Sequence, residues 1–354
     1  MCSTENSNGQ SKLRQSMSEI NQHTIFDIIK VPTQPLQKLA DSILQLSDHF
    51  VNNPDDLTPW TEKFCQEAYR YYYLPLNYLR CFNVIQRGQL VNFFKDVETS
   101  VDWGSGPGTA SMALSQLLGS QIKKQILIDQ SDIALKVFSD LHSHLKNKEI
   151  TDKLSLKNLS VYTKKSLLVF SYSLTEMKSL PDGYEQFESI MILEPSTQND
   201  GRKLLQIREK LIAQGYHIWA PCVHQQSCPL QNQSKTDWCH DRFHVKAPDW
   251  FLKMEPFLPF RNRTITTSYL LAKKTPPPAE IKNFARITGD SLDEKGKTRQ
   301  LVCRNTDREF LTWMHKSITV QTIPRGELVT LPTELEKKSN ELRLSHPVDI
   351  KKNS

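Results

Sequence analysis

Apolar residues recur along this chain in two patterns, and the change from one to the other divides the sequence. From Ile25 to Phe94 they recur at helical spacing, which predicts a helical N-terminal region. From Thr99 to about Pro221, short apolar runs alternate with helical stretches. The runs predict strands at Ser100–Trp103, Gln125–Asp129, Ser166–Ser171, Ser189–Leu193 and His217–Ala220. Strands that alternate with helices are typical of a parallel, doubly wound sheet that binds ligands at the carboxyl ends of its strands.

The remaining segments predict smaller additions to this α/β fold. Thr266–Ala272 has the pattern of a further strand, and Pro276–Pro278 indicate a linker. Residues 1–24 are rich in Ser, Gln and Asn and lack an apolar signal segment, which predicts a disordered lead-in. We therefore expect a helical region (25–98), a Rossmann-like domain (99–275) with a cysteine segment (220–245), a small β-rich appendage (279–330) and a charged tail (333–354).

Composition narrows the class of protein. The 354 residues suffice for a sizeable core, and no run of eighteen apolar residues exists, so no membrane span is expected. The seven cysteines are an odd number without a secretory signal, which argues against disulfides. Residues 251–354 hold 19 of the 45 Lys and Arg but 12 of the 39 Asp and Glu, leaving 26 against 27 before them. This surplus is where a polyanion would dock, although a solvated surface with a charged tail has the same composition.

A glycine-rich segment joins the first predicted strand to a helix. Gly104, Gly106 and Gly108 stand at alternate positions, with Asp102 two residues before the first. Glycine permits a tight turn and a close approach of the backbone to a ligand, and the following helix N-terminus favours negative charge. The spacing departs from the Gly-x-Gly-x-x-Gly of dinucleotide-binding proteins. It fits the first motif of S-adenosylmethionine-dependent methyltransferases, and the alternative is a glycine turn in some other α/β protein.

Further polar residues lie at the ends of the following strands. Asp129 ends the second predicted strand, where its carboxylate would accept hydrogen bonds from both ribose hydroxyls of the cofactor. The third strand is not followed by the Asp/Asn-Pro-Pro-aromatic motif that accepts a base amine. Tyr172 and Glu194 are the candidates for the acceptor side, and Glu194 is equally well explained as a solvated carboxylate at a helix N-terminus. Cofactor binding is thus better supported than catalysis.

Three cysteines occur within eighteen residues, directly after the strand His217–Ala220. Cys222, Cys228 and Cys239 lie among polar residues that are poor core material, although a free cysteine can pack as a small hydrophobe. Cys303 is the best-placed fourth candidate. Structural zinc sites usually have ligands in pairs two to four residues apart, whereas five, ten and sixty-three residues intervene here. An iron-sulfur cluster suits this spacing at least as well, which leaves zinc as the alternative.

These motifs resemble a known family, the methyltransferase-like proteins associated with the small ribosomal subunit of bacteria and mitochondria. The likeness covers about Tyr69–Val320, and it is carried by the first glycine motif, Ser171–Glu176, Glu194-Pro195, Ala220–His224, Cys228–Leu230 and Trp238–His240. The resemblance implies an S-adenosylmethionine methyltransferase domain of the Rossmann type. The candidate cofactor-binding residues, at the glycine motif and the strand ends, are Asp102, Gly104, Gly106, Gly108, Asp129 and Ser171. The [4Fe-4S] ligands that the resemblance implies are Cys222, Cys228, Cys239 and Cys303.

Two functions are compatible with this resemblance. The first is an assembly or translation factor that binds S-adenosylmethionine and the rRNA of the small ribosomal subunit, with a cluster of structural role. The second is an active rRNA methyltransferase. A radical S-adenosylmethionine enzyme would use Cys-x3-Cys-x2-Cys, which is absent. The expected protein is a monomer away from the ribosome, in the cytoplasm, or in the mitochondrial matrix if its source is eukaryotic.

Overall fold

The computed structural model describes residues 23–53, 56–145, 147–151, 156, 159, 164–177 and 179–351. It divides into two compact units. One comprises the residues before Arg80 together with His244–Thr264, and the other comprises Arg80–Phe243 together with the residues from Ile265 onward. The predicted lead-in lies outside the described residues except for its last two positions. Within the described part, no helix has the length and apolar character needed to cross a membrane.

The first unit is helical. Its elements are α2 (His23–Ile29), α3 (Leu36–Asn52), α4 (Lys63–Ala68), the π-helix η1 (Tyr69–Tyr73), the start of α5 (Leu74–Gln89), α10 (Asp249–Met254) and the 3-10 turn η7 (Glu255–Phe257). Leu39 and Ile43 are buried on one face of α3 because they recur at helical spacing. Tyr72 stacks on Phe251 with ring centroids 5.9 Å apart. Its hydroxyl donates to Asn262 Oδ1 at 3.0 Å, across 190 positions of the sequence.

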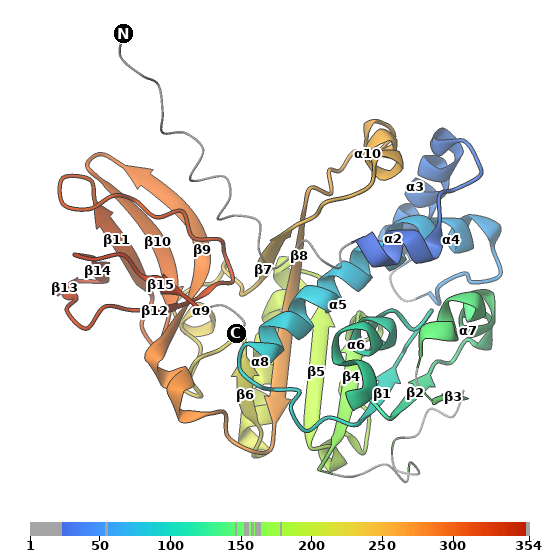
Figure 1. Ribbon diagram of the computed structural model, residues 1–354, viewed down its shortest axis with the longest axis horizontal. Helices are drawn as coiled ribbons and strands as arrows, with labels where there is room; N and C mark the ends of the chain where they lie inside the picture. Colours follow the sequence, from blue (N-terminus) through green and yellow to red (C-terminus); the bar gives the residue numbers. More distant parts are fainter. Residues whose placement is uncertain are drawn as a thin grey trace. The chain divides into compact units, whose positions relative to one another are not determined.

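The second unit contains a mainly parallel sheet with strand order β3-β2-β1-β4-β5-β8-β6, and β7 pairs with β8 (Figure 1). The strands are β1 (Thr99–Trp103), β2 (Lys124–Ile128), β3 (Lys148–Thr151), β4 (Ser166–Ser171), β5 (Ser189–Glu194), β6 (His217–Ala220), β7 (Asp241–His244) and β8 (Thr264–Lys273). The pairs from β3 to β5 are parallel, whereas β8 runs antiparallel to both β5 and β6. Strands β4 and β5 are buried at almost every position, as expected for a parallel sheet covered on both faces.

Helices follow the parallel strands, and α6 and α8 lie along the sheet (Figure 1). The helices of this unit are the rest of α5, α6 (Thr109–Leu118), α7 (Asp132–Val137), α8 (Gln198–Ala213) and α9 (Pro229–Asn232). The 3-10 turns are η2 (Gly119–Gln121), η3 (Ser139–His144), η5 (Leu174–Glu176), η6 (Tyr184–Gln186) and η8 (Ala279–Asn283). Thr197 caps α8 by accepting a hydrogen bond from the Asp200 amide at 3.2 Å. The predicted Rossmann-like fold with a helical N-terminal region is confirmed.

A second sheet follows the prolines, with strand order β13-β14-β11-β10-β9-β12-β15. Its strands are β9 (Phe284–Glu294), β10 (Lys297–Cys303), β11 (Glu309–Met314), β12 (Leu328–Thr330), β13 (Glu336–Lys338), β14 (Glu341–Arg343) and β15 (Asp349–Ile350). The last three strands come from the stretch expected as a charged tail. They form because Leu342, Leu344 and Val348 pack with the fully buried Trp313, although charged residues surround them in the sequence. The predicted β-rich C-terminal part is thus present, and it is larger than expected.

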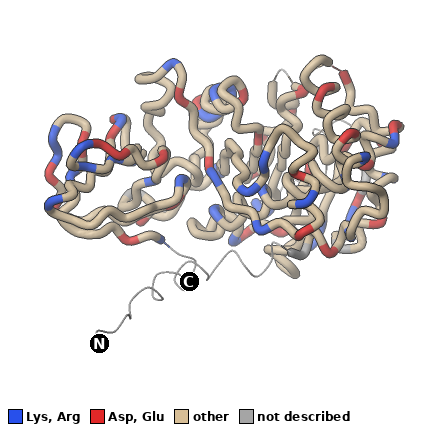
Figure 2. The backbone as a smooth tube through the Cα atoms, turned by 90° about the horizontal axis from the view of Figure 1, so that it is seen from above, with Lys and Arg blue, Asp and Glu red and all other residues tan. Residues whose placement is uncertain are grey.

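Several basic residues in and beside this second sheet are paired with acidic neighbours. Glu309 is bound by Arg304 at 2.6 Å and by Lys337 at 2.8 Å, and Lys297 pairs with Glu341. Figure 2 shows Lys and Arg interspersed with Asp and Glu along the chain. Both partners of these pairs lie in the last third of the sequence, so its excess of Lys and Arg over Asp and Glu is unchanged by them.

Candidate functional site

The glycine-rich loop connects β1 to α6 and turns sharply at the carboxyl end of β1. Its shape requires glycine at two positions in particular. Gly104 has φ +67°, and a Cβ placed there would lie 2.6 Å from the Cβ of Ser173. Gly108 has φ +79°, and its Cβ would lie 2.8 Å from Leu127. The Gly104 amide donates to the Ile128 carbonyl at 2.8 Å, so the loop is fastened to the end of β2.

The two predicted carboxylates are engaged by the loop and its helix. Asp129 Oδ2 accepts from the Gly106 amide at 2.7 Å, and its Oδ1 accepts from the Ser131 amide at 2.8 Å. Asp102 Oδ2 accepts from the Ser111 hydroxyl at 2.8 Å, and burial raises the pKa of Asp102 to about 6. Asp102 therefore fixes α6 to β1. Asp129 fixes the loop. Each of its carboxylate oxygens accepts one amide, so each keeps a lone pair that could accept from a ligand hydroxyl.

Ser171 and Tyr172 follow at the end of β4. The Ser171 hydroxyl lies 3.4 Å from the sulfur of Cys81. Tyr172 adopts φ +62°, and its hydroxyl lies 3.3 Å from that of Thr267 on β8. Burial raises the pKa of Tyr172 to about 12, so the phenol stays neutral at physiological pH. A neutral, hydrogen-bonded phenol can position a ligand, but it is a poor general base.

Glu194 ends β5 as a buried carboxyl rather than a solvated one. Its Oε1 accepts from the Leu174 amide at 3.0 Å, and burial raises its pKa to about 8. Four buried oxygens at the ends of β1, β4 and β5 have no hydrogen-bond partner among the described residues: Asp102 Oδ1, Ser105 Oγ, Ser173 Oγ and Glu194 Oε2. Buried polar atoms normally have partners, so this edge of the sheet fits a polar ligand.

The four cysteines singled out in the sequence line one cavity of about 30 Å³. Cys222 follows β6, Cys228 precedes α9, Cys239 precedes β7, and Cys303 ends β10 in the second sheet. Three of them thus lie in the segment between β6 and β7, and the fourth lies in a strand of the second sheet. All four are free thiols, and Cys228 and Cys239 pack against Leu205 from α8. A cavity of this size admits more than one water-sized atom.

The thiols influence one another across this cavity. Burial raises the pKa of Cys239 to about 12. It also raises the pKa of Cys228 and Cys303, and the neighbouring Cys222 adds to both shifts. The Cys303 sulfur lies 3.5 Å from His224 Nε2, and burial lowers the pKa of His224 to about 4. Thiolates crowded in this way would need a cation or metal centre to be stable.

A fully buried arginine stands beside the sulfurs. Arg208, on the buried face of α8, donates from Nε to the sulfur of Cys222 at 3.2 Å. Its Nη2 donates to the carbonyls of His224 at 3.0 Å and Gln226 at 2.8 Å. Burying a cation is costly unless it is paired and hydrogen-bonded. Arg208 also forms an ion pair with the part-exposed Glu209, so the sulfur of Cys222 is a further acceptor for its guanidinium.

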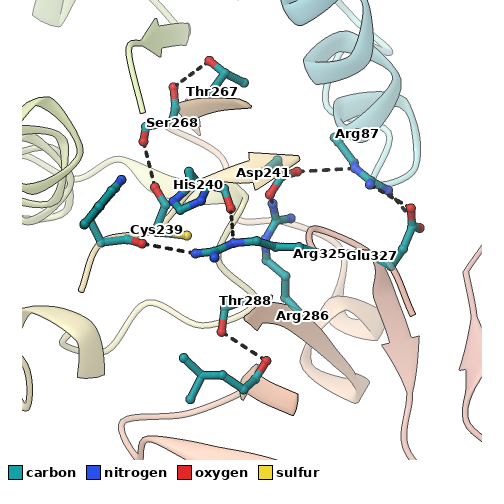
Figure 3. A network of polar contacts seen from close by, with 12 residues as sticks. Arg87, Cys239, His240, Asp241, Thr267, Ser268, Arg286, Thr288, Arg325 and Glu327 are labelled. Carbon is teal, nitrogen blue, oxygen red and sulfur yellow. Dashed lines mark hydrogen bonds and ion pairs between the residues drawn. The ribbon is translucent and has the colours of Figure 1, made fainter. Parts of the chain in front are cut away.

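A second buried arginine belongs to a network that joins the two sheets. Arg286 on β9 lines the cysteine cavity and forms an ion pair with Asp241 on β7 (Figure 3). Asp241 Oδ2 also lies 3.5 Å from Arg87 on α5, which binds Glu327 at 2.8 Å. Arg286 and Asp241 are almost completely buried, so their charges balance each other within the protein.

The donor set of the cavity fits a metal centre, although the side chains do not define one by themselves. Four sulfurs and a nearby imidazole are the ligand types that zinc and iron-sulfur clusters use. Within the described ranges, no three His, Cys, Asp or Glu side chains stand in the geometry of a bound metal ion. The chemistry of the site is thus compatible with either centre.

Sequence reasoning missed both arginines and the contact that positions Cys239. Gly201 on α8 lets Trp238 approach, since a Cβ there would lie 2.4 Å from the indole ring. Trp238 Nε1 donates to the Ser196 carbonyl at 2.7 Å. Arg208 could have been found from the sequence, because it occupies a position in the apolar stripe of α8 that includes Leu204 and Leu211. A charge in such a stripe needs a buried partner.

Comparison with protein-family models gives one match over most of the chain. The model described as "Mitochondrial small ribosomal subunit Rsm22" matches residues 68–317. This range includes the glycine-rich loop and all four cysteines of the cavity. Among curated proteins, none matches this sequence.

Solved structures with a similar fold are methyltransferases of low sequence identity. A putative RNA methyltransferase from Pyrococcus horikoshii is 11% identical, with 68% of this chain and 98% of that chain covered and a TM-score of 0.32. An O-methyltransferase family protein from Burkholderia thailandensis is 11% identical, with 68% and 70% covered and a TM-score of 0.35. Magnesium protoporphyrin IX methyltransferase from Synechocystis is 12% identical, with 66% and 100% covered and a TM-score of 0.31. At these scores the likeness carries no argument about activity.

Proposed function

The chain belongs to the family of the mitochondrial small ribosomal subunit protein Rsm22, and we propose that it is a methyltransferase-like factor of small-subunit assembly or translation. In this proposal it acts in the mitochondrial matrix, binds S-adenosylmethionine and rRNA, and holds a [4Fe-4S] cluster on Cys222, Cys228, Cys239 and Cys303. The cluster would have a structural role, because its ligands would join the segment between β6 and β7 to β10 of the second sheet.

One observation carries the cluster proposal. Three thiols from one segment and a fourth from the distant Cys303 line a single cavity, next to an arginine that donates to one of the sulfurs. Four protonated thiols would not require the buried guanidinium of Arg208, whereas thiolates bound to iron would be stabilised by it. Zinc on the same four ligands is the alternative, and metal analysis distinguishes the two.

The test is anaerobic purification followed by iron, sulfide and zinc analysis and an absorption spectrum. We expect about four irons per chain, as the cluster type requires. Cys303→Ser should lose this iron, whereas Cys65→Ser, which replaces a buried free thiol that does not line the cavity, should keep it. If the analysis finds one zinc per chain, the site binds zinc and the cluster proposal is wrong. If it finds no metal, both proposals are wrong.

Binding of S-adenosylmethionine rests on the loop at the end of β1. Gly104, Gly106 and Gly108 give the backbone its tight turn, and Asp129 holds that turn by the Gly106 amide. The unpartnered oxygens of Ser105, Ser173 and Glu194 are further candidate contacts. Asp102 and Ser171 support the strands on which the loop rests. Calorimetric titration with S-adenosylmethionine and S-adenosylhomocysteine tests this part.

Binding of rRNA and methyl transfer need their own tests. Crosslinking and sequencing of bound RNA should recover small-subunit rRNA, and its absence would sink the ribosomal assignment. An active rRNA methyltransferase remains the second candidate, because Tyr172 and Glu194 stand at strand ends beside the proposed cofactor site. If a variant that no longer binds S-adenosylmethionine fails in subunit assembly while every methyl mark on the rRNA persists, the methyltransferase function is excluded.

A further inference from the structure

Two arginines on α8 hold the cysteine segment, and they do so in nearly the same way. Arg202 donates to the carbonyls of Ser234 at 3.1 Å and Asp237 at 3.0 Å, between Cys228 and Cys239. Arg208 donates to the carbonyls of His224 and Gln226, between Cys222 and Cys228. Each arginine therefore fastens one loop between two of the proposed ligands.

Only one of the two has a recorded bond to sulfur. Arg208 Nε donates to Cys222 Sγ at 3.2 Å, in addition to its carbonyl contacts. The contacts of Arg202, all from Nη1, are to carbonyl oxygens alone, which is what a loop clamp requires. The sulfur contact is therefore an additional feature that a purely mechanical role leaves unexplained.

The balance of charge singles out Arg208 among the buried arginines of the cavity. Arg286 lines the same cavity, but its partner Asp241 is 1% exposed and balances its charge inside the protein (Figure 3). Arg208 is 0% exposed, and its carboxylate partner Glu209 is 39% exposed. Water screens the charge of Glu209, so less of the Arg208 charge is cancelled. The positive field of Arg208 thus remains available to the sulfurs.

Resting on the cluster of the proposed function, we propose that Arg208 is a positioning residue that raises the reduction potential of that cluster and holds it in the protein. When the cluster takes up one electron from a reductant, its negative charge increases by one. A nearby guanidinium and a hydrogen bond to a ligand sulfur stabilise that added charge. Net charge and hydrogen bonds to sulfur are the properties by which proteins set such potentials.

The experiment is a redox titration of anaerobically purified full-length protein with dithionite, followed by electron paramagnetic resonance. Arg208→Met removes the charge and the donor but keeps much of the side-chain volume. We expect it to shift the equilibrium tenfold toward the oxidised cluster, which corresponds to a potential lower by about 59 mV. Arg208→Lys keeps the charge, and its potential should lie closer to that of the original protein. Arg202→Met is the matched control, since it removes a loop clamp without touching sulfur, and its potential should change less than that of Arg208→Met.

The outcomes separate this inference from the proposed function. If the unaltered protein contains no iron, the proposed function fails before Arg208 is tested. If Arg208→Met and Arg208→Lys load iron and have the original potential, the role of Arg208 is mechanical and the inference is wrong. If Arg208→Met contains no iron while Arg208→Lys and Arg202→Met contain it, the positive charge at position 208 is needed to hold the cluster in the protein. This outcome supports the inference. If Arg208→Lys also fails to load, the loop clamp alone explains the residue, and the inference is overturned.

Discussion

The glycine-rich loop and the cysteine cavity are assembled in opposite ways. The loop is closed by the hydrogen bond between Gly106 and Asp129, which are 23 positions apart and belong to adjacent strand ends. The cavity brings together residues such as His224 and Cys303, which are 79 positions apart and belong to the regions of two different sheets. The loop is thus a product of one βαβ unit, whereas the cavity exists only while the two sheets are docked. Changes at the interface between the sheets should therefore affect the cavity and spare the loop.

Removal of Arg286 is expected to have the largest effect on this contrast. Arg286→Met removes the nearest ion-pair partner of the buried Asp241 and leaves Arg87 at 3.5 Å. Breaking a buried ion pair by removing one partner costs about 3–5 kcal/mol. We expect that loss in the free energy of unfolding, measured by chemical denaturation. We also expect loss of iron, whereas binding of S-adenosylmethionine by the folded protein should persist.

The matched control is an exposed pair at the same interface. Arg242 binds Asp290 at 2.8 Å, with side chains that are 40% and 52% exposed. Arg242→Met should cost less than about 1 kcal/mol, because such pairs are screened by solvent. If both variants lost the same stability, the buried network would not be what holds the sheets together. If Arg286→Met lost cofactor binding and iron together, the two sites would not be independent.

The contrast also explains what could be predicted from the sequence. The strands and the glycine turn follow from patterns within a few dozen residues, and β1, β2, β4, β5 and β6 have nearly the predicted bounds. The four cysteines were chosen on chemistry and family resemblance, since no local pattern joins Cys303 to the other three. The strands β13 to β15 escaped prediction because their apolar residues are few and separated by charges, and only packing on Trp313 explains them.

The polar partners could not be predicted for a different physical reason. A carboxylate at a strand end, such as Asp129 or Glu194, has the same sequence signature whether it faces a ligand or the backbone of its own loop. The structure shows Asp129 bound to two backbone amides and Glu194 bound to one. Hydrogen-bond partners are fixed by tertiary geometry within tenths of an ångström. Sequence spacing does not carry that information.

A substitution at Gly104 tests the converse, that a change in the glycine-rich loop affects cofactor binding and spares the cysteine cavity. Gly104→Ala would place a Cβ 2.6 Å from that of Ser173 at φ +67°. Gly119→Ala has a comparable φ of +52°, but its Cβ would meet nothing within 4 Å. The positive φ strains the backbone of both variants, and the clash adds about 1–3 kcal/mol to the first alone. Calorimetry should show lost cofactor binding only for Gly104→Ala, with iron retained in both. Equal binding in the two would contradict a role for this close approach.

The smallest expected effect is the pH dependence of stability that Glu194 causes. It tests the proposed cofactor site and leaves the cysteine cavity unchanged. Burial raises the pKa of Glu194 to about 8, so its stabilising contribution is complete below its unfolded pKa and is lost as pH rises through 8. Between pH 7 and 8 the free energy of unfolding should fall by on the order of 1 kcal/mol. Glu194→Gln stays neutral and should remove this fall, as measured by urea denaturation at each pH. In the folded protein, the pKa of Asp102 is about 6 and that of His224 is about 4, so both groups titrate mainly below pH 7. Parallel pH profiles for the variant and the original protein would show that Glu194 is solvated after all.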